Sequence, residues 1–372
     1  MYLIRRAQAK DIDLMLKLAK MVHFINLPAD KEIITEKVQR SRISFRAVAR
    51  GEETLEIAGD RSAVGQSPLF VFVIEDTSTG NALGCSMVVS KMGGPDHPNI
   101  AFDLTRREFF SKDLQMGTTQ VTAKLIADTS SPTEIGGLIL GPSFRRHPAR
   151  LGKQISLIRF HFIGAHRRHF ADTVLAEMMA PITPDGRNTL WEFLGRRFIN
   201  LSYSEADKFC QHSREFMLNL LPREEIYLSL LPPEARALVG EVGPDTMPAR
   251  RMLESLGFAY NGRIDPFDGG PHLNANTDDI ELVRDTFTAP LAGAGEGASM
   301  QHTGFVSSFN EDGEFRAMYS SFERNGTESI SLPAETISML ETREGDDIAC
   351  TPIDLGVRPS YVGELRDTKT AP

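Results

Sequence analysis

Cysteine is scarce in this sequence of 372 residues. Its three cysteines, Cys85, Cys210 and Cys350, are far apart and odd in number, and none lies in a C-x-x-C pair or at a cysteine–histidine ligand spacing. We therefore expect neither a disulfide framework nor a structural zinc site. Three reduced, buried thiols are the expected arrangement, as is usual in cytoplasmic proteins.

Long hydrophobic runs and an excess of positive charge are also missing. No stretch approaches the roughly 20 apolar residues that a membrane-spanning helix needs, and the first residues lack the apolar core of a secretory signal. The formal net charge is −9, whereas a general nucleic-acid binder needs a net cationic face to displace counterions. We expect a cytoplasmic protein with no membrane or nucleic-acid partner.

The composition that remains is that of an ordinary globular protein, with 41% hydrophobic and 24% charged residues. The chain is long enough for two domains. Residues 288–303 are rich in alanine and glycine, which predicts a linker. We expect residues 1–287 to form the main domain and residues 304–366 to form a small β-rich appendage. A disordered end should follow.

The predicted elements begin with a strand, two helices and a hairpin. Residues 2–4 are of extended type, and the second helix is predicted over residues 30–45 from its helical spacing of apolar side chains. Residues 69–74 and 82–89 are apolar runs joined by turn residues, which predicts a hairpin. The polar stretch over residues 91–131 is compatible with irregular structure or with further strands.

The most informative segment is a strand, a basic loop and a helix in succession. Residues 134–140 have the apolar character of a buried strand, and residues 151–162 place apolar side chains at helical spacing. A helix N-terminus binds phosphate well, because its N–H groups lack partners and the helix dipole is positive there. The loop and first turn add four cations and a glycine that allows close backbone approach: Arg145, Arg146, Arg150, Lys153 and Gly152.

This combination fits the pantetheine arm and pyrophosphate of coenzyme A. The strand would offer backbone donors and acceptors to the amide-bearing arm, and the loop would hold the phosphates. A solvated surface loop is the alternative interpretation, because basic loops before helices are common on protein surfaces. The negative net charge would also attract a cationic second substrate.

The order of elements resembles the GNAT acyltransferases, whose central strand is followed by an Arg/Gln-x-x-Gly-x-Gly/Ala motif. Counting back from Gly152 puts Arg150 at the middle glycine and His147 at the first position. We expect an α+β, GNAT-like acyl-CoA N-acyltransferase fold, a mixed twisted sheet flanked by helices, with the β-rich C-terminal appendage. Side-chain charge should replace one backbone N–H in the phosphate cradle.

Longer blocks resemble one family of this class, the arginine N-succinyltransferases. The most distinctive are residues 190–198 and 264–271, within a resemblance over roughly residues 1–285. Further blocks follow in the right order: residues 26–30, 71–76, 175–178, 204–207 and 248–258.

The resemblance implies an activity and a set of ligands. A succinyl group would pass from succinyl-CoA, a co-substrate and not a permanently bound cofactor, to the α-amine of L-arginine in arginine catabolism. The succinyl-CoA contact on the central strand falls at Leu138, and we extend it to Ile139 and Leu140 on the same strand. Because the family includes two-chain forms, we expect a homo-oligomer or a hetero-oligomer with a paralogous chain.

One position departs from the family. The family's proposed proton donor is a histidine in a Gly-x-Val-His-Pro motif, whereas residues 240–244 place Gly243 at the histidine position. The attacking amine must lose a proton and the leaving thiolate often gains one, and glycine can assist neither step. Three hypotheses stay open: another residue serves, the acyl-CoA or amine acceptor differs, or the chain is a non-catalytic CoA-binding subunit.

Three residues are candidates for the missing chemistry. His272 directly follows the Asp-Gly-Gly-Pro block and is the first candidate for the acid–base group, with a surface-loop histidine as the alternative. Glu177 could hold the substrate amine at a strand end, or make an ordinary hydrogen bond. Asp268 could bind a guanidinium substrate, or cap its own turn.

Other conspicuous side chains have structural explanations. His161, His166 and His169 lie on or just past one predicted helix, but no carboxylate supports them as ligands, so we expect no metal site. Trp191 and Phe193 are aromatic residues expected in the core.

Overall fold

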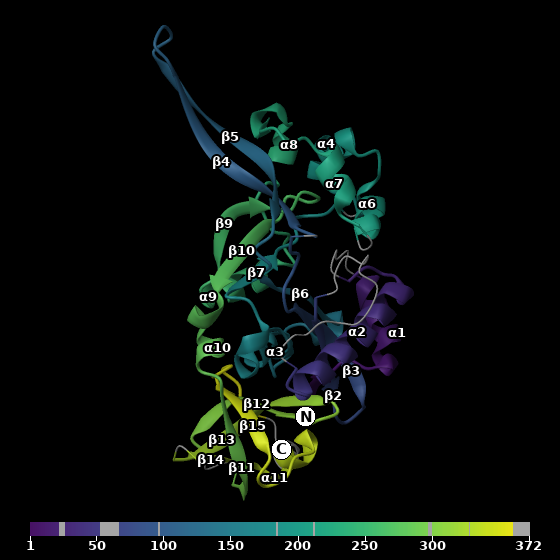
Figure 1. The fold of residues 1–372 in the computed structure, drawn as a ribbon, viewed down its shortest axis with the longest axis vertical. Helices are drawn as coiled ribbons and strands as arrows, with labels where there is room; N and C mark the ends of the chain where they lie inside the picture. The colour runs from purple at the N-terminus through teal and green to yellow at the C-terminus, as the bar shows by residue number, and fades with distance from the viewer. Residues whose placement is uncertain are drawn as a thin grey trace, which may run out of the picture.

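The computed structural model describes residues 1–21, 27–52, 67–95, 97–183, 185–210, 213–296, 300–326 and 328–359. The molecule is elongated, with the C-terminal strands at one end and a long hairpin projecting from the other (Figure 1). None of the helices in these ranges is both long and apolar enough to cross a membrane.

The N-terminal part has the strand, helices and hairpin that the sequence predicts. Asp30 caps the second helix, because its side chain accepts hydrogen bonds from the backbone N–H groups of Glu32 and Ile33. Buried side chains of both helices pack on one face of the hairpin strands. The elements are β1 (Tyr2–Arg6), α1 (Ile12–Ala19), α2 (Lys31–Ala49), β2 (Leu69–Asp76) and β3 (Asn81–Val89).

The polar stretch that follows forms a long two-stranded arm. β4 (Asn99–Ser111) and β5 (Met116–Asp128) pair along their whole length. Only their inner ends are buried, and Phe109 and Phe110 are 45% and 64% exposed on the outer part. Figure 1 shows this arm reaching away from the body. The sequence pattern left it undecided because the outer residues carry no apolar alternation.

The middle of the chain forms the predicted strand, helix and strand. β6 (Thr133–Leu140), α3 (Leu151–Ala165) and β7 (Thr173–Glu177) follow one another. The two strands are parallel, but their pairing is confined to Thr133 with Val174 and Glu134 with Leu175 among the described residues. Beyond that point β6 pairs only with β3, on its other edge. A wedge therefore opens between the later parts of β6 and β7.

A group of short helices covers the next part of the sheet. Trp191 is fully buried, its ring stacks on Phe267 at 5.0 Å, and its Nε1–H donates to the carbonyl of Leu201. Phe193 packs against the same core, which confirms the prediction for both aromatic residues. The elements are α4 (Thr189–Phe193), α5 (Gly195–Phe198), α6 (Tyr203–Cys210), α7 (Glu215–Leu220), β8 (Ile226–Tyr227), α8 (Pro233–Arg236), α9 (Met247–Ser255), β9 (Ala259–Ile264) and β10 (Pro271–Asn276).

The C-terminal part is β-rich, as expected, but it is continuous with the main sheet. β13 (Phe315–Asn325) pairs with β1, with Ile4 opposite Ala317. The first half of the expected linker is itself a strand, β11 (Phe287–Gly295), which pairs with two C-terminal strands, so the linker prediction is wrong there. The elements are α10 (Glu281–Arg284), β11 (Phe287–Gly295), β12 (His302–Phe309), β13 (Phe315–Asn325), β14 (Ser329–Pro333), α11 (Ala334–Leu340) and β15 (Asp347–Pro352).

The remaining boundaries of the expected parts stay predictions, and the disorder expected at the end of the chain lies outside the described residues. All three cysteines are free and buried, as the sequence predicts. The fifteen strands of the described residues join in one mixed sheet, with helices against it. This is the α+β architecture expected from the sequence.

Candidate active site

The first part of the site is the wedge between β6 and β7. Ile139 is buried against the core under α1 and α2, whereas Leu138 and Leu140 pack toward the core that contains α3. Gly137 adopts a left-handed φ of +56°, beside a register shift in the β3–β6 pairing. An added Cβ would lie 2.4 Å from the end of the Met87 side chain, which would have to move, so both the space and the φ angle favour glycine at this irregularity. The strand edge beyond Glu134 can therefore offer backbone groups to an amide-bearing ligand.

The second part is the basic loop at the N-terminus of α3. The Arg150 carbonyl accepts the N–H groups of Lys153 and Gln154, and the Gln154 side chain donates to the Ala149 carbonyl. The first two N–H groups of α3, at Leu151 and Gly152, have no backbone acceptor in the described part of the chain. Such N–H groups are able to donate to an anion.

Arg146 and Arg150 hold this loop in an unusual backbone conformation. Their φ angles are +60° and +55°, in the left-handed region that favours glycine. Arg150 occupies the position where the GNAT motif has its middle glycine, so the structure explains the glycine preference and shows an arginine adopting the same conformation. Gly152 has open space in front of it, with Leu140 at 3.9 Å from an added Cβ.

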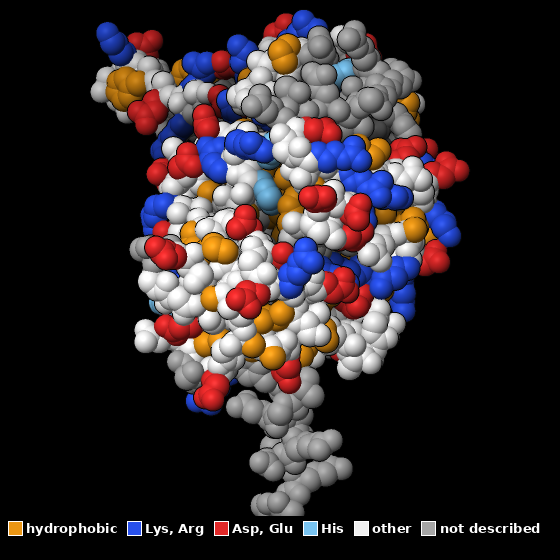
Figure 2. Space-filling model, turned by 60° about the horizontal axis from the view of Figure 1, so that its bottom comes forward, with side chains coloured by type: hydrophobic (Ala, Val, Ile, Leu, Met, Phe, Trp, Pro, Cys, Tyr) orange, Lys and Arg blue, Asp and Glu red, His pale blue; other side chains and the backbone are white. Residues whose placement is uncertain are grey.

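The four cations of the loop are exposed. Arg145 lies 3.8 Å from the Asp245 carboxylate, whereas Arg146, Arg150 and Lys153 form no ion pair with any described residue. On the molecular face drawn in Figure 2, positive and negative side chains are interspersed, and no single-sign patch extends across it.

The third part is a buried histidine–carboxylate pair. His272 lies on β10 directly opposite Glu177 on β7, and His272 Nε2 is 3.7 Å from Glu177 Oε1. His272 is only 2% exposed, so the surface-loop alternative is wrong. The sequence missed β10 because its polar residues interrupt the apolar pattern. Burial lowers the pKa of His272, which favours the neutral imidazole that a base requires.

Two residues that the sequence did not suggest hold Glu177 in place. The Asn99 side-chain amide donates to Glu177 Oε1 at 3.0 Å, and Arg214 Nη1 donates to Asn99 Oδ1 at 3.0 Å. The carboxylates of Glu177 and its neighbours raise the pKa of Arg214 against the effect of its burial. Asn99 and Arg214 are far apart in sequence and belong to no motif, so no pattern could have identified them.

Asp268 caps its own turn, which is the alternative that the sequence offered. Its two carboxylate oxygens accept hydrogen bonds from the backbone N–H groups of Gly270, at 2.7 Å, and Ala180, at 3.0 Å. It is 1% exposed, and both of its oxygens are engaged by the backbone. Asp265 caps the same loop through the N–H groups of Phe267 and Asp268. Burial raises the pKa of both carboxyl groups.

One group of side chains could hold a metal ion. Single ligand atoms of Glu177, Asp265 and His272 lie within 4.8 Å of one another, a spacing compatible with a divalent cation after small adjustments. His161 is not available as a ligand, because its ring nitrogens bond to the hydroxyls of Thr351 and Ser307. Burial lowers the pKa of His161 to about 3.

Gly243 lies where the wedge opens. Its backbone N–H donates to the carbonyl of Met179, just past the end of β7, and Asp245 two residues later approaches Arg145. An added Cβ would lie 3.5 Å from the Ala180 carbonyl oxygen, an ordinary contact distance. The backbone therefore leaves room for a side chain at this position, although this chain has none.

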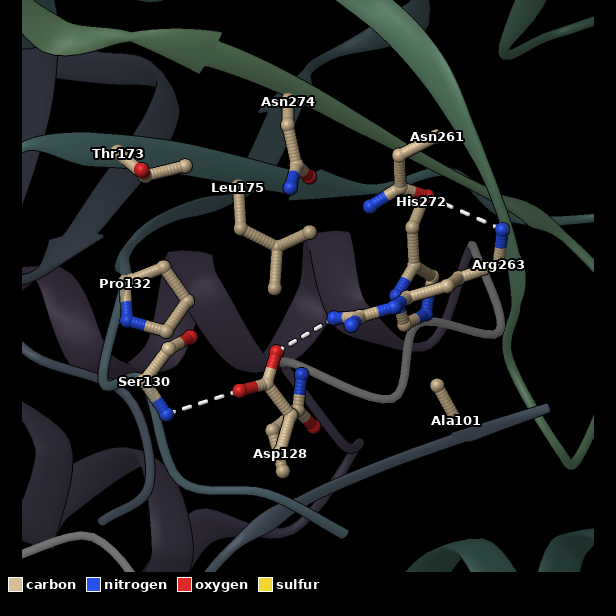
Figure 3. Close-up of a pocket in the computed structure, with 11 residues that line it drawn as sticks. Ala101, Asp128, Ser130, Pro132, Thr173, Leu175, Asn261, Arg263, His272 and Asn274 are labelled. Atoms are coloured by element: carbon tan, nitrogen blue, oxygen red, sulfur yellow. Dashed lines mark hydrogen bonds and ion pairs between the residues drawn. The ribbon is translucent and has the colours of Figure 1, made fainter. Parts of the chain in front are cut away.

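A pocket of about 170 Å³ lies beside His272, which is one of its lining residues. Its walls include Leu175 and Thr173 of β7 and Asn274 of β10, and the ion pair between Asp128 and Arg263 forms part of its lining (Figure 3). The basic loop, the wedge, the His272–Glu177 pair and this pocket thus involve the consecutive strands β6, β7 and β10.

Comparisons with known proteins cover nearly the whole chain. The family model described as "Arginine N-succinyltransferase beta subunit" matches residues 2–282. The arginine N-succinyltransferase of Citrobacter koseri is 30% identical over 351 residues, which are 94% of this chain and 96% of that protein. The corresponding protein of Yersinia enterocolitica is 32% identical over 287 residues, 76% of this chain and 78% of the relative.

A solved structure shares the fold. The arginine/ornithine succinyltransferase subunit AI of Pseudomonas aeruginosa superposes with a TM-score of 0.76 and 25% sequence identity. The match covers 95% of this chain and 99% of that one. The GNAT-like fold expected from the sequence is confirmed.

Proposed function

Because this chain belongs to the arginine N-succinyltransferase family, we propose that it transfers the succinyl group of succinyl-CoA to the α-amine of L-arginine. The observation that carries the proposal is the wedge between β6 and β7, with a basic helix N-terminus beyond β6 and a buried histidine–carboxylate pair beside it. These three features supply a seat for the coenzyme and a base for the amine.

Succinyl-CoA would lie along the open edge of β6. The backbone of Leu138, Ile139 and Leu140 would bond the amides of the pantetheine arm, as an added strand would. The pyrophosphate would meet the free N–H groups of Leu151 and Gly152, and the exposed cations of the loop would neutralise its charge. The thioester would then lie in the wedge, within reach of β7.

The acid–base role falls to His272, held beside Glu177. A neutral imidazole can take the proton that the amine loses as its nitrogen bonds the thioester carbon. Collapse of the tetrahedral intermediate breaks the carbon–sulfur bond, and the CoA thiolate leaves with the electron pair and gains a proton. Glu177, fixed by Asn99, would stabilise the imidazolium that forms. We expect direct transfer in a ternary complex, since all three thiols are buried.

A second candidate function is favoured by Gly243. Without a histidine at this position, the chain could acylate a different amine, use a different acyl-CoA, or serve as a non-catalytic CoA-binding subunit. Release of free CoA thiol separates these candidates, with succinyl-CoA and acetyl-CoA tested against arginine, ornithine and lysine. Turnover with succinyl-CoA and arginine supports the first proposal. Tight CoA binding without turnover supports the subunit, and thermal stability unchanged by CoA contradicts the coenzyme site.

The proposed assembly is an oligomer, with a second copy of this chain or with a paralogous chain. The projecting arm supports it, because a two-stranded ribbon alone is marginally stable in water and this one exposes Phe109 and Phe110. Light scattering on the purified protein tests the state, and Phe110→Ser should weaken an assembly that uses the arm. We also expect no permanently bound cofactor, no metal, and no nucleic-acid or membrane partner. The expected location is the cytoplasm, and fractionation of the native host tests this location.

A further inference from the structure

The pocket beside His272 has the size of a side-chain site. Its volume of about 170 Å³ is below the roughly 300–1,000 Å³ of pockets that enclose drug-sized ligands. It is therefore too small for a coenzyme but suits the side chain of an amino acid. Leu175 forms its apolar floor, and Thr173, Asn274 and Asp128 surround it with polar groups (Figure 3).

Two buried polar atoms on the pocket-lining residues have no hydrogen-bond partner among the described residues. They are Asn274 Oδ1 and His272 Nε2, whose distance of 3.7 Å to Glu177 Oε1 is too long for a hydrogen bond. Both residues belong to β10 and are two positions apart, so their side chains project from the same face of the strand. A buried polar atom without a hydrogen bond is destabilising, and two of them at one pocket point to a ligand that supplies the missing hydrogen bonds.

The charges around the pocket favour a cation. Arg263 Nη1 lies 2.6 Å from an Asp128 oxygen, and the same guanidinium faces Asp103 at 3.9 Å. Two carboxylates thus surround one cation, Arg263, which itself lines the pocket, and Glu177 adds a further carboxylate behind His272, with Arg214 beyond Asn99. The three carboxylates outnumber the two arginines by one charge. Each acidic group favours a ligand with positive charge and N–H donors over a neutral one.

The position of the pocket relates it to the reacting amine. His272 both lines the pocket and lies opposite Glu177, at the end of β7 where the wedge is open. An amino acid whose side chain enters between Asn274 and Asp128 would therefore leave its α-amine near the imidazole. The pocket lies on the face of the sheet away from α3, whose N-terminus carries the basic loop. Leu175 lines the pocket and is not in the core that α3 shares with the sheet, whereas Val174 and Ala176, on the other face of β7, belong to that core.

We propose that this pocket binds the cationic side chain of the acceptor amino acid, with Asn274 and Thr173 as the residues that select the acceptor. The inference rests on the proposed function and adds the acceptor site to it. A guanidinium would donate to Asn274 Oδ1 and face the Asp128 carboxylate, while the α-amine approaches His272.

The test uses two substitutions that keep side-chain shape and remove polarity, Asn274→Leu and Thr173→Val. We expect Asn274→Leu to raise the KM for arginine by about 10- to 100-fold, the effect of losing a hydrogen bond from a charged donor. Thr173→Val should raise it less. The KM for succinyl-CoA should stay within about twofold in both, because the coenzyme lies along β6. Asn81→Leu, at an exposed asparagine on β3, is the matched control.

Citrulline provides an independent readout on the wild-type protein, because it has nearly the shape of arginine without its charge. With CoA present, calorimetry should give at least about tenfold weaker binding for citrulline than for arginine. Equal affinities overturn the pocket assignment, even if neither variant folds. An unchanged arginine KM in folded Asn274→Leu, or equal increases for both substrates, also overturns it. Absence of any turnover with arginine in the wild type contradicts the proposed function instead.

Discussion

The two sides of the proposed site differ in burial and in how their charges are held. On the proposed coenzyme side, Arg146, Arg150 and Lys153 are exposed and form no ion pair with described residues, and the helix N–H groups beside them have no backbone acceptor there. On the acceptor side, His272, Asp265 and Asp268 are buried, and the two aspartates are held by backbone donors. Substitutions on the first side should change coenzyme affinity alone. Those on the second side should change catalysis and stability.

The largest expected effect is at His272. His272→Gln keeps the side chain polar but removes the base, so kcat should fall by about 10²- to 10⁴-fold, the usual value of general acid–base assistance. Steady-state kinetics measure this, and His97→Gln, at an exposed histidine, is the control. An unchanged kcat in a folded variant rules out His272 as the base. Activity that is lost on chelation and restored by a divalent cation would instead assign it to a metal site.

Gly243→His tests whether a histidine at the family's usual position can take over the acid–base role of His272. The added Cβ meets only ordinary contacts, and the side chain would enter at the mouth of the wedge. In the His272→Gln background we expect it to restore about tenfold of the lost rate, a part of the usual acid–base contribution. The double variant is compared with His272→Gln alone at several pH values. If the added histidine leaves the rate unchanged, this position does not reach the reacting atoms.

On the coenzyme side, Arg150→Gly removes a charge and restores the glycine of the motif. We expect the KM for succinyl-CoA to rise by about 10-fold, since a charge-assisted contact to phosphate is lost. Stability should change by less than about 1 kcal/mol, because the left-handed strain relieved at φ +55° offsets the greater freedom of the unfolded chain. Arg251→Gly, at an exposed helical arginine of α9, is the control. A raised KM for arginine would contradict the separation of the two sides.

Asp268→Ala tests the acceptor side for stability. It leaves the buried N–H groups of Gly270 and Ala180 without acceptors, which should lower the free energy of unfolding by about 1–3 kcal/mol. Chemical denaturation measures this, with Asp245→Ala, at an exposed loop residue, as the control. A loss of arginine affinity without a loss of stability would restore Asp268 as a substrate ligand.

The smallest expected effect is a pH dependence of stability from His272. Because burial lowers the pKa of this imidazole, the unfolded chain binds a proton that the folded chain does not. The contribution of His272 to the free energy of unfolding is therefore fully present above the ordinary histidine pKa of about 6.5, and it declines as the pH falls below that value. Denaturation midpoints between pH 5 and 8 should fall less steeply toward acid in His272→Gln than in the wild type. Identical slopes contradict a buried neutral histidine.

Sequence patterns predicted the elements of the proposed coenzyme side. The strand over residues 134–140, the basic loop and the helix that follows are contiguous, so local spacing and charge were enough to predict them. The blocks quoted for the arginine N-succinyltransferase family led to the right family, which the family model confirms. Gly243 was also visible in the sequence, since it interrupts a short motif.

The residues of the proposed acceptor side could not be predicted from local sequence patterns. Asn99, Glu177, Arg214 and His272 come from four segments, and only the pairing of β7 with β10 brings two of them together. The sequence offered two interpretations of Asp268 and could not choose, because the choice depends on the Ala180 N–H that lies 88 residues away.

By itself, the sequence determined the family, the GNAT-like order of elements and the position of the basic loop, because each depends on neighbours in the chain. Only the tertiary structure decided that the C-terminal strands join β1 and that a buried histidine lies against a carboxylate. The physical reason is that burial, desolvation and cross-strand contacts arise from segments distant in sequence. The scarcity of cysteine argued against a disulfide framework, and in the structure the strands of the described residues are instead joined in one hydrogen-bonded sheet.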